Sequence, residues 1–322
     1  MYDHAIGLES EGMMEKKVVV IGSLNYDVCL KQEHLPEEGE TCFADSVEYC
    51  SGGKGANQAV QASKLGIPVY MVGCIGRDQQ GEFLKTNIER YGVCTDYLKR
   101  VDENSGMSVA QSLYDGGVRA SVVKGSNDKV AKEDVDALDE FLHTGDIVVL
   151  QLEIPIPVVE YAIRFCKERG CYVILNGAPA APIDEAILKL VNLFVVNELE
   201  AEFYCGREIV SPEVAVEEIR KMTVHLGNIC IYTLGKAGSV VCSGSQAEFV
   251  PAKEVQAVES TGAGDSFIGG LCYALTHDMD IFSATRFATC CSAKTVCKTG
   301  GQPAMPTLEE VMELYHAEPI NQ

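Results

Sequence analysis

Short runs of apolar, mostly β-branched residues recur along the chain and alternate with longer stretches of helical periodicity. The apolar runs are VVVIG from Val18, VYMVG from Val69, DIVVLQLE from Asp146, CYVILN from Cys171, LFVVN from Leu193 and ICIYTLG from Ile229. The helical stretches cover 57–65, 81–91, 130–142, 157–169 and 212–226. Strands that are apolar throughout and separated by helices are typical of a sheet covered on both faces. The pattern therefore predicts an α/β fold with a central, mostly parallel sheet flanked by helices, and ligand-binding residues just after the strands.

Two segments do not follow this alternation, namely residues 29–50 and 106–124. The second contains SLYDGGVRASVV, which predicts a hairpin that turns at YDGG. We expect the two segments to form a small β-sheet lid beside the main body. Because no repeat, low-complexity tract or linker divides the rest of the sequence, we expect residues 18–316 to form a single domain.

Composition and charge exclude several classes of protein. The formal charge of −21 argues against a protein that tracks a nucleic-acid backbone. The apolar runs are shorter than the ~20 residues that a membrane helix needs. Residues 1–17 lack the cationic start and long apolar core of a secretion signal, and we expect them to be a disordered or tag-like extension. The 14 cysteines form no CxxC pair, which favours reduced thiols and a cytoplasmic protein.

Polar side chains follow one apolar run after another. Asn25 and Asp27 come after the first run, and the two-residue period of extended chain places them on one face. A carboxylate beside an amide suits the hydroxyls of a sugar, although a turn stabilised by both side chains would leave the same pattern. Later runs are followed by Glu153, Asn176, Asn197, Glu200, Thr233 and Gly235. Each of these could be a helix cap, but together they lie where the fold predicts a site.

The segment SGGKGANQAVQASKLG, residues 51–66, combines glycines with a single early cation, Lys54. Glycines let the backbone approach a ligand, and we expect a helix to begin near Ala56. The segment is not a Walker P-loop, since no Gly-Lys pair in the chain precedes Ser or Thr. It is not a GxGxxG motif either, because Gln58 occupies the sixth place. A plain glycine turn is the alternative.

The stretch STGAGDSFIGG, residues 260–270, places one carboxylate among glycines before an apolar helix. If that helix begins near Asp265, the amides of Gly262, Ala263 and Gly264 point into a space that favours anions. Asp265 could then accept the proton of an attacking hydroxyl while these amides stabilise a phosphoryl group. Alternatively, Asp265 only stabilises the helix start. A helix start also lowers the pKa of an acid, which phosphoryl transfer tolerates because positioning carries most of its rate.

These motifs resemble the paired signatures of the ribokinase-like (PfkB) carbohydrate kinases, here GGKGANQAVQASKLG and STGAGDSFIGGL. The segments GSLNYD, QLE, NGAPA, NELEAE, TLG and GGQPAMPT resemble the ribokinases within that family. The resemblance runs from about Val18 to Thr307, nearly the whole chain. It implies a ribokinase-like fold in which a small β-sheet lid closes over the sugar and often builds a homodimer.

The resemblance also implies a role for each matching residue. Sugar-binding positions of the family match Asn25, Asp27, Gly53, Lys54, Asn57 and Glu153. Asp265 matches the base that activates the 5-hydroxyl. The anion hole matches Gly262, Ala263 and Gly264. ATP-binding positions match Asn197, Thr233 and Gly235, and the residue that serves Mg²⁺ through water matches Glu200.

The departures from the family concern a monovalent cation that ribokinases bind behind the anion hole. The resemblance implies backbone ligands at Thr261, Thr295, Lys298 and Gly300. Where we expect Asp and Ser as side-chain ligands, this chain has Glu259 and Ala304. Glutamate reaches one methylene further and alanine offers no oxygen, so we expect activation by K⁺ to be weakened or lost.

Together these features predict an ATP- and Mg²⁺-dependent kinase for the primary hydroxyl of a pentose, with D-ribose as the leading substrate. A nucleoside kinase of the same family, such as one for pseudouridine, is the alternative, and the shape of the pocket under segment 106–124 would distinguish the two. An inactive sugar or nucleotide sensor is a more distant alternative, against which the retained Asp265 argues. The expected partners are a small-molecule sugar, ATP and a second copy of the chain.

Overall fold

The computed structural model describes residues 16–114 and 118–317. Most of the extension expected at 1–17 and most of the turn expected at 114–117 therefore lie outside the described residues. Within them, nine strands form the larger sheet, in the order β13, β12, β11, β10, β9, β8, β1, β4, β5. Its strands are β1 Val18–Ile21, β4 Val69–Gly76, β5 Cys94–Val101, β8 Ile147–Leu150, β9 Tyr172–Asn176, β10 Leu193–Asn197, β11 Ile229–Thr233, β12 Gly238–Ser243 and β13 Gln246–Pro251. All pairings from β5 to β11 are parallel, and β12 and β13 add an antiparallel edge.

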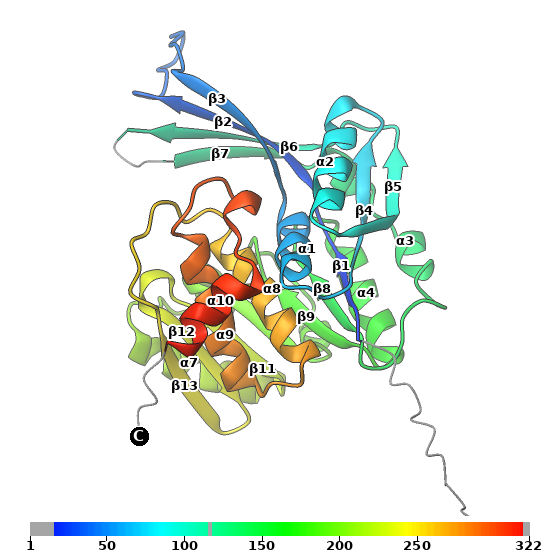
Figure 1. Ribbon diagram of the computed structural model, residues 1–322. Helices are drawn as coiled ribbons and strands as arrows, with labels where there is room; N and C mark the ends of the chain where they lie inside the picture. The colour runs from blue at the N-terminus through cyan, green and yellow to red at the C-terminus, as the bar shows by residue number, and fades with distance from the viewer. Residues whose placement is uncertain (1–15, 115–117, 318–322) are drawn as a thin grey trace, which may run out of the picture.

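Helices cover both faces of this sheet (Figure 1). They are α1 Lys54–Lys64, α2 Gln79–Arg90, α3 Lys132–Asp136, α4 Ile156–Glu168, α5 Glu185–Leu188, α6 Glu198–Cys205, α7 Pro212–Leu226, α8 Ala263–Thr276, α9 Ile281–Thr295 and α10 Leu308–His316. Short 3-10 turns are η1 Gly125–Lys129, η2 Gly235–Ala237 and η3 Gln302–Ala304. The predicted α/β fold is confirmed.

All four residues of strand β1 are apolar, and their burial on both faces of the sheet explains why. Val18 and Val20 pack in one buried cluster with residues of α1, α8 and α9, whereas Val19 and Ile21 pack in another with residues of α4 and α7. Because every residue of the strand is buried on one face or the other, each one must be apolar.

The predicted helix over 212–226 has the same bounds as α7, because both of its ends carry clear signals. The Ser211 hydroxyl accepts a hydrogen bond from the Val214 amide, Pro212 is the first helical residue, and Gly227 ends the helix with φ 74°. A capping Ser followed by Pro, and Gly in the left-handed conformation, start and stop helices.

The predicted helix over 130–142 is wrong for most of its length, since only α3 is helical there. From Leu138 onward several amides donate to the carbonyl three residues back, as Leu138 does to Val135 and Phe141 does to Leu138. A period of three places Val135, Leu138 and Phe141 on one side as well as a helix does. The apolar spacing of this segment therefore could not distinguish a helix from a run of tight turns.

Four strands form a second, smaller sheet, in the order β3, β2, β6, β7 among the described residues. They are β2 Asn25–Gln32, β3 Ser46–Gly52, β6 Gly106–Leu113 and β7 Val118–Val123. Figure 1 shows this sheet above the main body, with α8, α9 and α10 below it. The expected small sheet is confirmed, and both segments named from the sequence contribute strands to it.

No helix within the described part of the chain is long and apolar enough to cross a membrane.

Candidate active site

Asp265 lies in the first turn of α8, which packs against α1. The helix begins at Ala263, two residues earlier than expected, because Gly262 caps it with φ 78°. The residue is buried, with 8% of its surface exposed. Its two carboxylate oxygens accept hydrogen bonds from α1, one from Asn57 Nδ2 at 2.9 Å and one from Gln58 Nε2 at 3.0 Å. Asp265 is therefore held in place on both of its oxygens.

Burial raises the pKa of Asp265, while the Lys54 ammonium and the hydrogen bonds from Asn57 and Gln58 oppose this rise. From the position of Asp265 at a helix start alone, we expect its pKa to be lowered. That expectation is wrong in sign, because the removal of water from the carboxylate outweighs the favourable charges around it. A raised pKa makes Asp265 a better proton acceptor at neutral pH.

The amides expected to form the anion hole are not equally available. The Ala263 amide donates to the Ser260 carbonyl at 3.2 Å, so it is already used in a turn. Gly264 lies in the first helical turn, whose amides have no acceptor within the helix. A side chain at Gly264 would meet no protein atom within 4 Å, which leaves open space beside its backbone. The Gly264 amide is therefore better placed to bind a phosphate than the Ala263 amide.

Lys54 is the first residue of α1, so this helix also begins two residues earlier than expected. Its backbone amide donates to Glu153 Oε2 at 3.0 Å, and the Ser23 hydroxyl donates to the same oxygen. Burial lowers the pKa of the Lys54 side chain, but the carboxylates of Asp265, Glu153 and Glu200 outweigh it and the net pKa is raised. The ammonium therefore stays charged among these acids.

Gly53 lets the start of α1 approach the smaller sheet. It adopts φ 89°, and a side chain there would lie 2.7 Å from the Asn25 backbone nitrogen. Both the dihedral angle and the close contact require glycine at this position.

Asn25 and Asp27 lie in β2, so they belong to the smaller sheet instead of a loop after β1. The side-chain oxygen of Asn25, Oδ1, accepts from Asn127 Nδ2 at 2.8 Å, and Asp27 Oδ1 accepts from the Ser108 hydroxyl at 2.5 Å. Burial raises the pKa of Asp27 to about 6, against the Ser108 hydrogen bond and with help from the charges of Glu153 and Asp265. The two residues share one face of the strand, as extended chain requires.

Asn197 and Glu200 form the first turn of α6 and cap it reciprocally. The Glu200 amide donates to Asn197 Oδ1 and the Asn197 amide donates to Glu200 Oε2, both at 2.9 Å. Burial raises the pKa of Glu200, while the Asn197 amide and Lys54 oppose this. The expectation of helix caps at strand ends is therefore met here, and the Glu200 carboxylate still lies within the electrostatic reach of Lys54.

Thr233 and Gly235 follow the neighbouring strand β11. Thr233 pairs in register with Asn197, and its hydroxyl donates to the Val196 carbonyl at 3.5 Å. A side chain at Gly235 would lie 3.6 Å from the Glu198 carboxylate. These residues adjoin the start of α6. The side-chain hydrogen bonds of Asp265 go to Asn57 and Gln58 instead.

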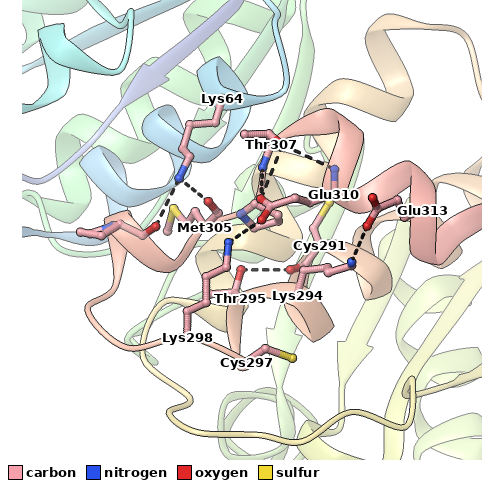
Figure 2. Close-up of polar contacts among 12 residues, drawn as sticks. Lys64, Cys291, Lys294, Thr295, Cys297, Lys298, Met305, Thr307, Glu310 and Glu313 are labelled. Carbon is pink, nitrogen blue, oxygen red and sulfur yellow. Dashed lines mark hydrogen bonds and ion pairs between the residues drawn. The ribbon is translucent and has the colours of Figure 1, made fainter.

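Some of the residues matched to the cation ligands of the family lie at the end of α9 and just after it, where Figure 2 labels Thr295 and Lys298, whereas Glu259 and Thr261 precede α8. The Lys298 side chain pairs with Glu310 of α10, and its amide donates to the Thr295 carbonyl at 3.2 Å. The Glu259 carboxylate accepts from the Gly300 amide at 3.1 Å. Of the matched ligand groups, the Glu259 carboxylate and the Thr295 carbonyl therefore already accept hydrogen bonds from the protein.

The segment between α9 and α10 is bound to α1 by the Lys64 side chain (Figure 2). Lys64 Nζ donates to the Met305 carbonyl and to the Gln302 carbonyl at 3.4 Å. Thr261 lies beside Gly301 of this segment, since a side chain at Gly301 would be 3.8 Å from Thr261 Cγ2. Ala304 is buried, and its side chain carries no oxygen.

Sequence reasoning missed the polar side chains that support the site from within. Ser108 and Asn127 hold Asp27 and Asn25, and nothing in their local sequence marks them. Gln58 lies within a motif already singled out, and its place in an Ala-rich helix is the signal that could have found it, because a polar residue on the buried face of such a helix needs polar partners.

Comparisons with known proteins agree with this geometry. The model of the pfkB family carbohydrate kinases matches residues 15–308. A ribokinase of Bacillus subtilis is 35% identical over 300 residues, which cover 93% of this chain and 99% of the relative. A deoxyribokinase of Salmonella typhi is 33% identical over 298 residues, covering 92% and 97% of the two chains.

The similarity extends to solved structures. The structure of a ribokinase of Arabidopsis thaliana complexed with ribose and ATP is similar with a TM-score of 0.86 and 30% identity. The match covers 95% of this chain and 100% of that one. The family resemblance seen in the sequence is confirmed, and the chain belongs to the pfkB family of carbohydrate kinases.

Proposed function

We propose that this protein is an ATP-dependent kinase that phosphorylates the 5-hydroxyl of D-ribose. The observation that carries the proposal is the buried Asp265 carboxylate, which lies beside the open backbone of Gly264 and within reach of Lys54 and Asn57. A proton acceptor next to an anion-binding helix start is what phosphoryl transfer to an alcohol requires. The high coverage of the ribokinase relatives supports ribose as the acceptor.

In this proposal, Asn25, Asp27 and Glu153 accept hydrogen bonds from the sugar hydroxyls, and Lys54 and Asn57 donate to them. The 5-hydroxyl attacks the γ-phosphorus of ATP, a new oxygen–phosphorus bond forms, and the bond to the bridging oxygen of ADP breaks. Asp265 takes the hydroxyl proton. The amides of Gly262, Ala263 and Gly264 stabilise the charge on the transferring group, for which the Ala263 amide must leave its turn with Ser260.

Asn197, Thr233 and Gly235 would bind ATP, and Glu200 would hold Mg²⁺ through a water molecule. The chemistry of Glu200 suits such a role, because a carboxylate is the preferred type of ligand for this ion. When bound, Mg²⁺ neutralises the charge that develops on the phosphate oxygens. Glu259 and the backbone oxygens of Thr261, Thr295, Lys298 and Gly300 would form a weakened site for K⁺, since Ala304 brings no ligand.

A homodimer that pairs through the smaller sheet completes the proposal. Its two edge strands carry apolar side chains in water, with Val47 and Tyr49 of β3 exposed to 44% and 57% and Val122 and Val123 of β7 to 55% and 63%. Exposed apolar edge strands are typical of protein interaction sites.

The proposed function is tested by ADP release with D-ribose, 2-deoxy-D-ribose, hexoses and nucleosides in parallel. We expect the highest kcat/KM with D-ribose, and only a small loss of rate when Na⁺ replaces K⁺. A higher kcat/KM with a nucleoside such as pseudouridine would contradict the choice of sugar. No ADP release with any acceptor, together with tight ligand binding, would favour a sensor.

A further inference from the structure

Asp265 is held by two relays of side-chain amides, one leading to each carboxylate oxygen. In the first, Gln151 Nε2 donates to Gln58 Oε1 at 2.7 Å, and Gln58 Nε2 donates to Asp265 Oδ1 at 3.0 Å. In the second, Gln302 Nε2 donates to Asn57 Oδ1 at 2.9 Å, and Asn57 Nδ2 donates to Asp265 Oδ2 at 2.9 Å.

The orientation of the Gln58 amide follows from the chemistry of its neighbours. An ionised carboxylate only accepts, so the NH₂ group of Gln58 must face Asp265. Its second N–H goes to Asn176 Oδ1 at 3.1 Å, and Asn176 is oriented by its own donation to the Val195 carbonyl at 3.2 Å. A flipped Gln58 would place an oxygen against two acceptors and leave the Gln151 donor without a partner.

The two relays differ in access to water. Gln58 and Gln151 are 1% and 0% exposed, so this relay lies within the core and cannot reach a sugar. Asn57 is half-buried, which leaves its amide able to exchange Asp265 for a ligand hydroxyl. One oxygen of the carboxylate is therefore bound by a buried donor, and the other is bound by a donor that is partly open to water.

We propose that Gln58 is a positioning residue, which fixes Asp265 Oδ1 so that Oδ2 is the oxygen that receives the proton from the sugar. The inference rests on the proposed function of Asp265 as the base and goes beyond it in naming the reactive oxygen and its support. The donation from Gln58 also favours the ionised carboxylate, which burial disfavours.

The test is Gln58→Met, which keeps the length of the side chain and removes the donor. We expect kcat to fall by up to about 10²-fold because the base is misplaced. We also expect the acid limb of the kcat/KM profile to move to higher pH by about one unit, the size of one lost hydrogen bond to a charged group. Ribose and ATP affinities, measured by calorimetry above that limb, should change little.

Gln61→Met is the matched control, since Gln61 is a fully buried amide of the same helix. Gln61 Nε2 donates to the Pro306 carbonyl at 3.1 Å and Oε1 accepts from Ser266, so it does not touch Asp265. We expect a comparable loss of thermal stability and an acid limb at the wild-type pH.

An unmoved acid limb in a folded Gln58→Met protein that binds both ligands would overturn the inference. If that variant does not fold, Gln151→Met replaces it, because this change removes only the donor behind Gln58. A smaller shift of the acid limb to higher pH would then support the inference. An unmoved acid limb would overturn it. Failure of the proposed function is distinguishable, since it would show as no ADP release with D-ribose by the wild-type protein. Failure of the role of Asp265 as the base would show as normal turnover by Asp265→Asn.

Discussion

Three carboxylates gather around one ammonium in this protein. Ionised carboxylates are normally kept in water, yet Asp265, Glu153 and Glu200 all lie within electrostatic reach of the Lys54 ammonium. Asp27 lies within reach of two of these acids, Glu153 and Asp265. Burial and mutual repulsion raise the pKa of Asp27 and Asp265, while Lys54 opposes the effect at Asp265. A sugar is suited to such a site, because each hydroxyl can donate to a carboxylate that lacks water.

The raised pKa of Asp27 predicts a specific effect of Asp27→Asn on stability. Because the folded-state pKa is about 6 and the ordinary value is 3.8, the contribution of Asp27 to stability is full below pH 3.8 and is lost as the pH rises through about 6. At pH 7.5 the variant should therefore be more stable by about 1–3 kcal/mol. It should also bind ribose more weakly, since an amide is a poorer acceptor than a carboxylate.

Urea unfolding from pH 4 to 7.5, with ribose affinity by calorimetry, measures both effects. The wild-type protein should lose stability relative to the variant across this range. Parallel pH profiles of the two proteins would contradict the assignment of a buried, charged Asp27.

The start of α8 is the element on which phosphate binding depends. Gly264→Ala adds a methyl group that meets no protein atom within 4 Å, and alanine favours a helix by ~0.5–1 kcal/mol over glycine. We expect the variant to melt at the same or a higher temperature. Because the methyl group fills the space proposed for the phosphate, kcat/KM for ATP should fall by roughly 10–100-fold.

Thermal unfolding and ATP-dependent steady-state kinetics check this pair of expectations. A variant that keeps both its stability and its kcat/KM for ATP would show that the phosphate lies elsewhere. A variant that loses stability would show that the space beside Gly264 is not open.

The elements that the sequence predicts well are those whose signals are local. Continuous apolar runs predict the parallel strands, and Ser211, Pro212 and Gly227 predict both ends of α7. The starts of α1 and α8 were placed two residues late, because glycine at the cap hides where helical geometry begins. The sequence interval between Gln58 and Gln151 is 93 residues, and only the tertiary fold brings such amides together.

At the scale of the whole molecule, the expected site lies where the two sheets meet. Asp27 comes from the smaller sheet and Asp265 from a helix of the main body, and Gly53 joins β3 directly to α1 between them. Neither sheet alone carries the full set of residues. The chemistry therefore depends on how the smaller sheet is held against the main body.

The proposed homodimer predicts the effect of Val123→Lys. A charge on this exposed residue of an edge strand should prevent two copies of the smaller sheet from pairing. Light scattering after gel filtration should give a dimer for the wild-type protein and a monomer for the variant. Val224→Lys, at an exposed position of α7, is the control and should remain dimeric. A wild-type monomer at micromolar concentration would contradict the proposal.

The most direct measurement is phosphorus NMR of the reaction between ATP and D-ribose in the presence of Mg²⁺. It is made with the wild-type protein and with Asp265→Asn. We predict that the wild-type protein forms ADP and a phosphate ester at the 5-carbon of ribose. The variant should bind both ligands and form the ester roughly 10²–10⁴-fold more slowly, the usual contribution of a general base. Absence of the 5-phosphate from the wild-type reaction, or its formation at a near wild-type rate by Asp265→Asn, would contradict the assignment.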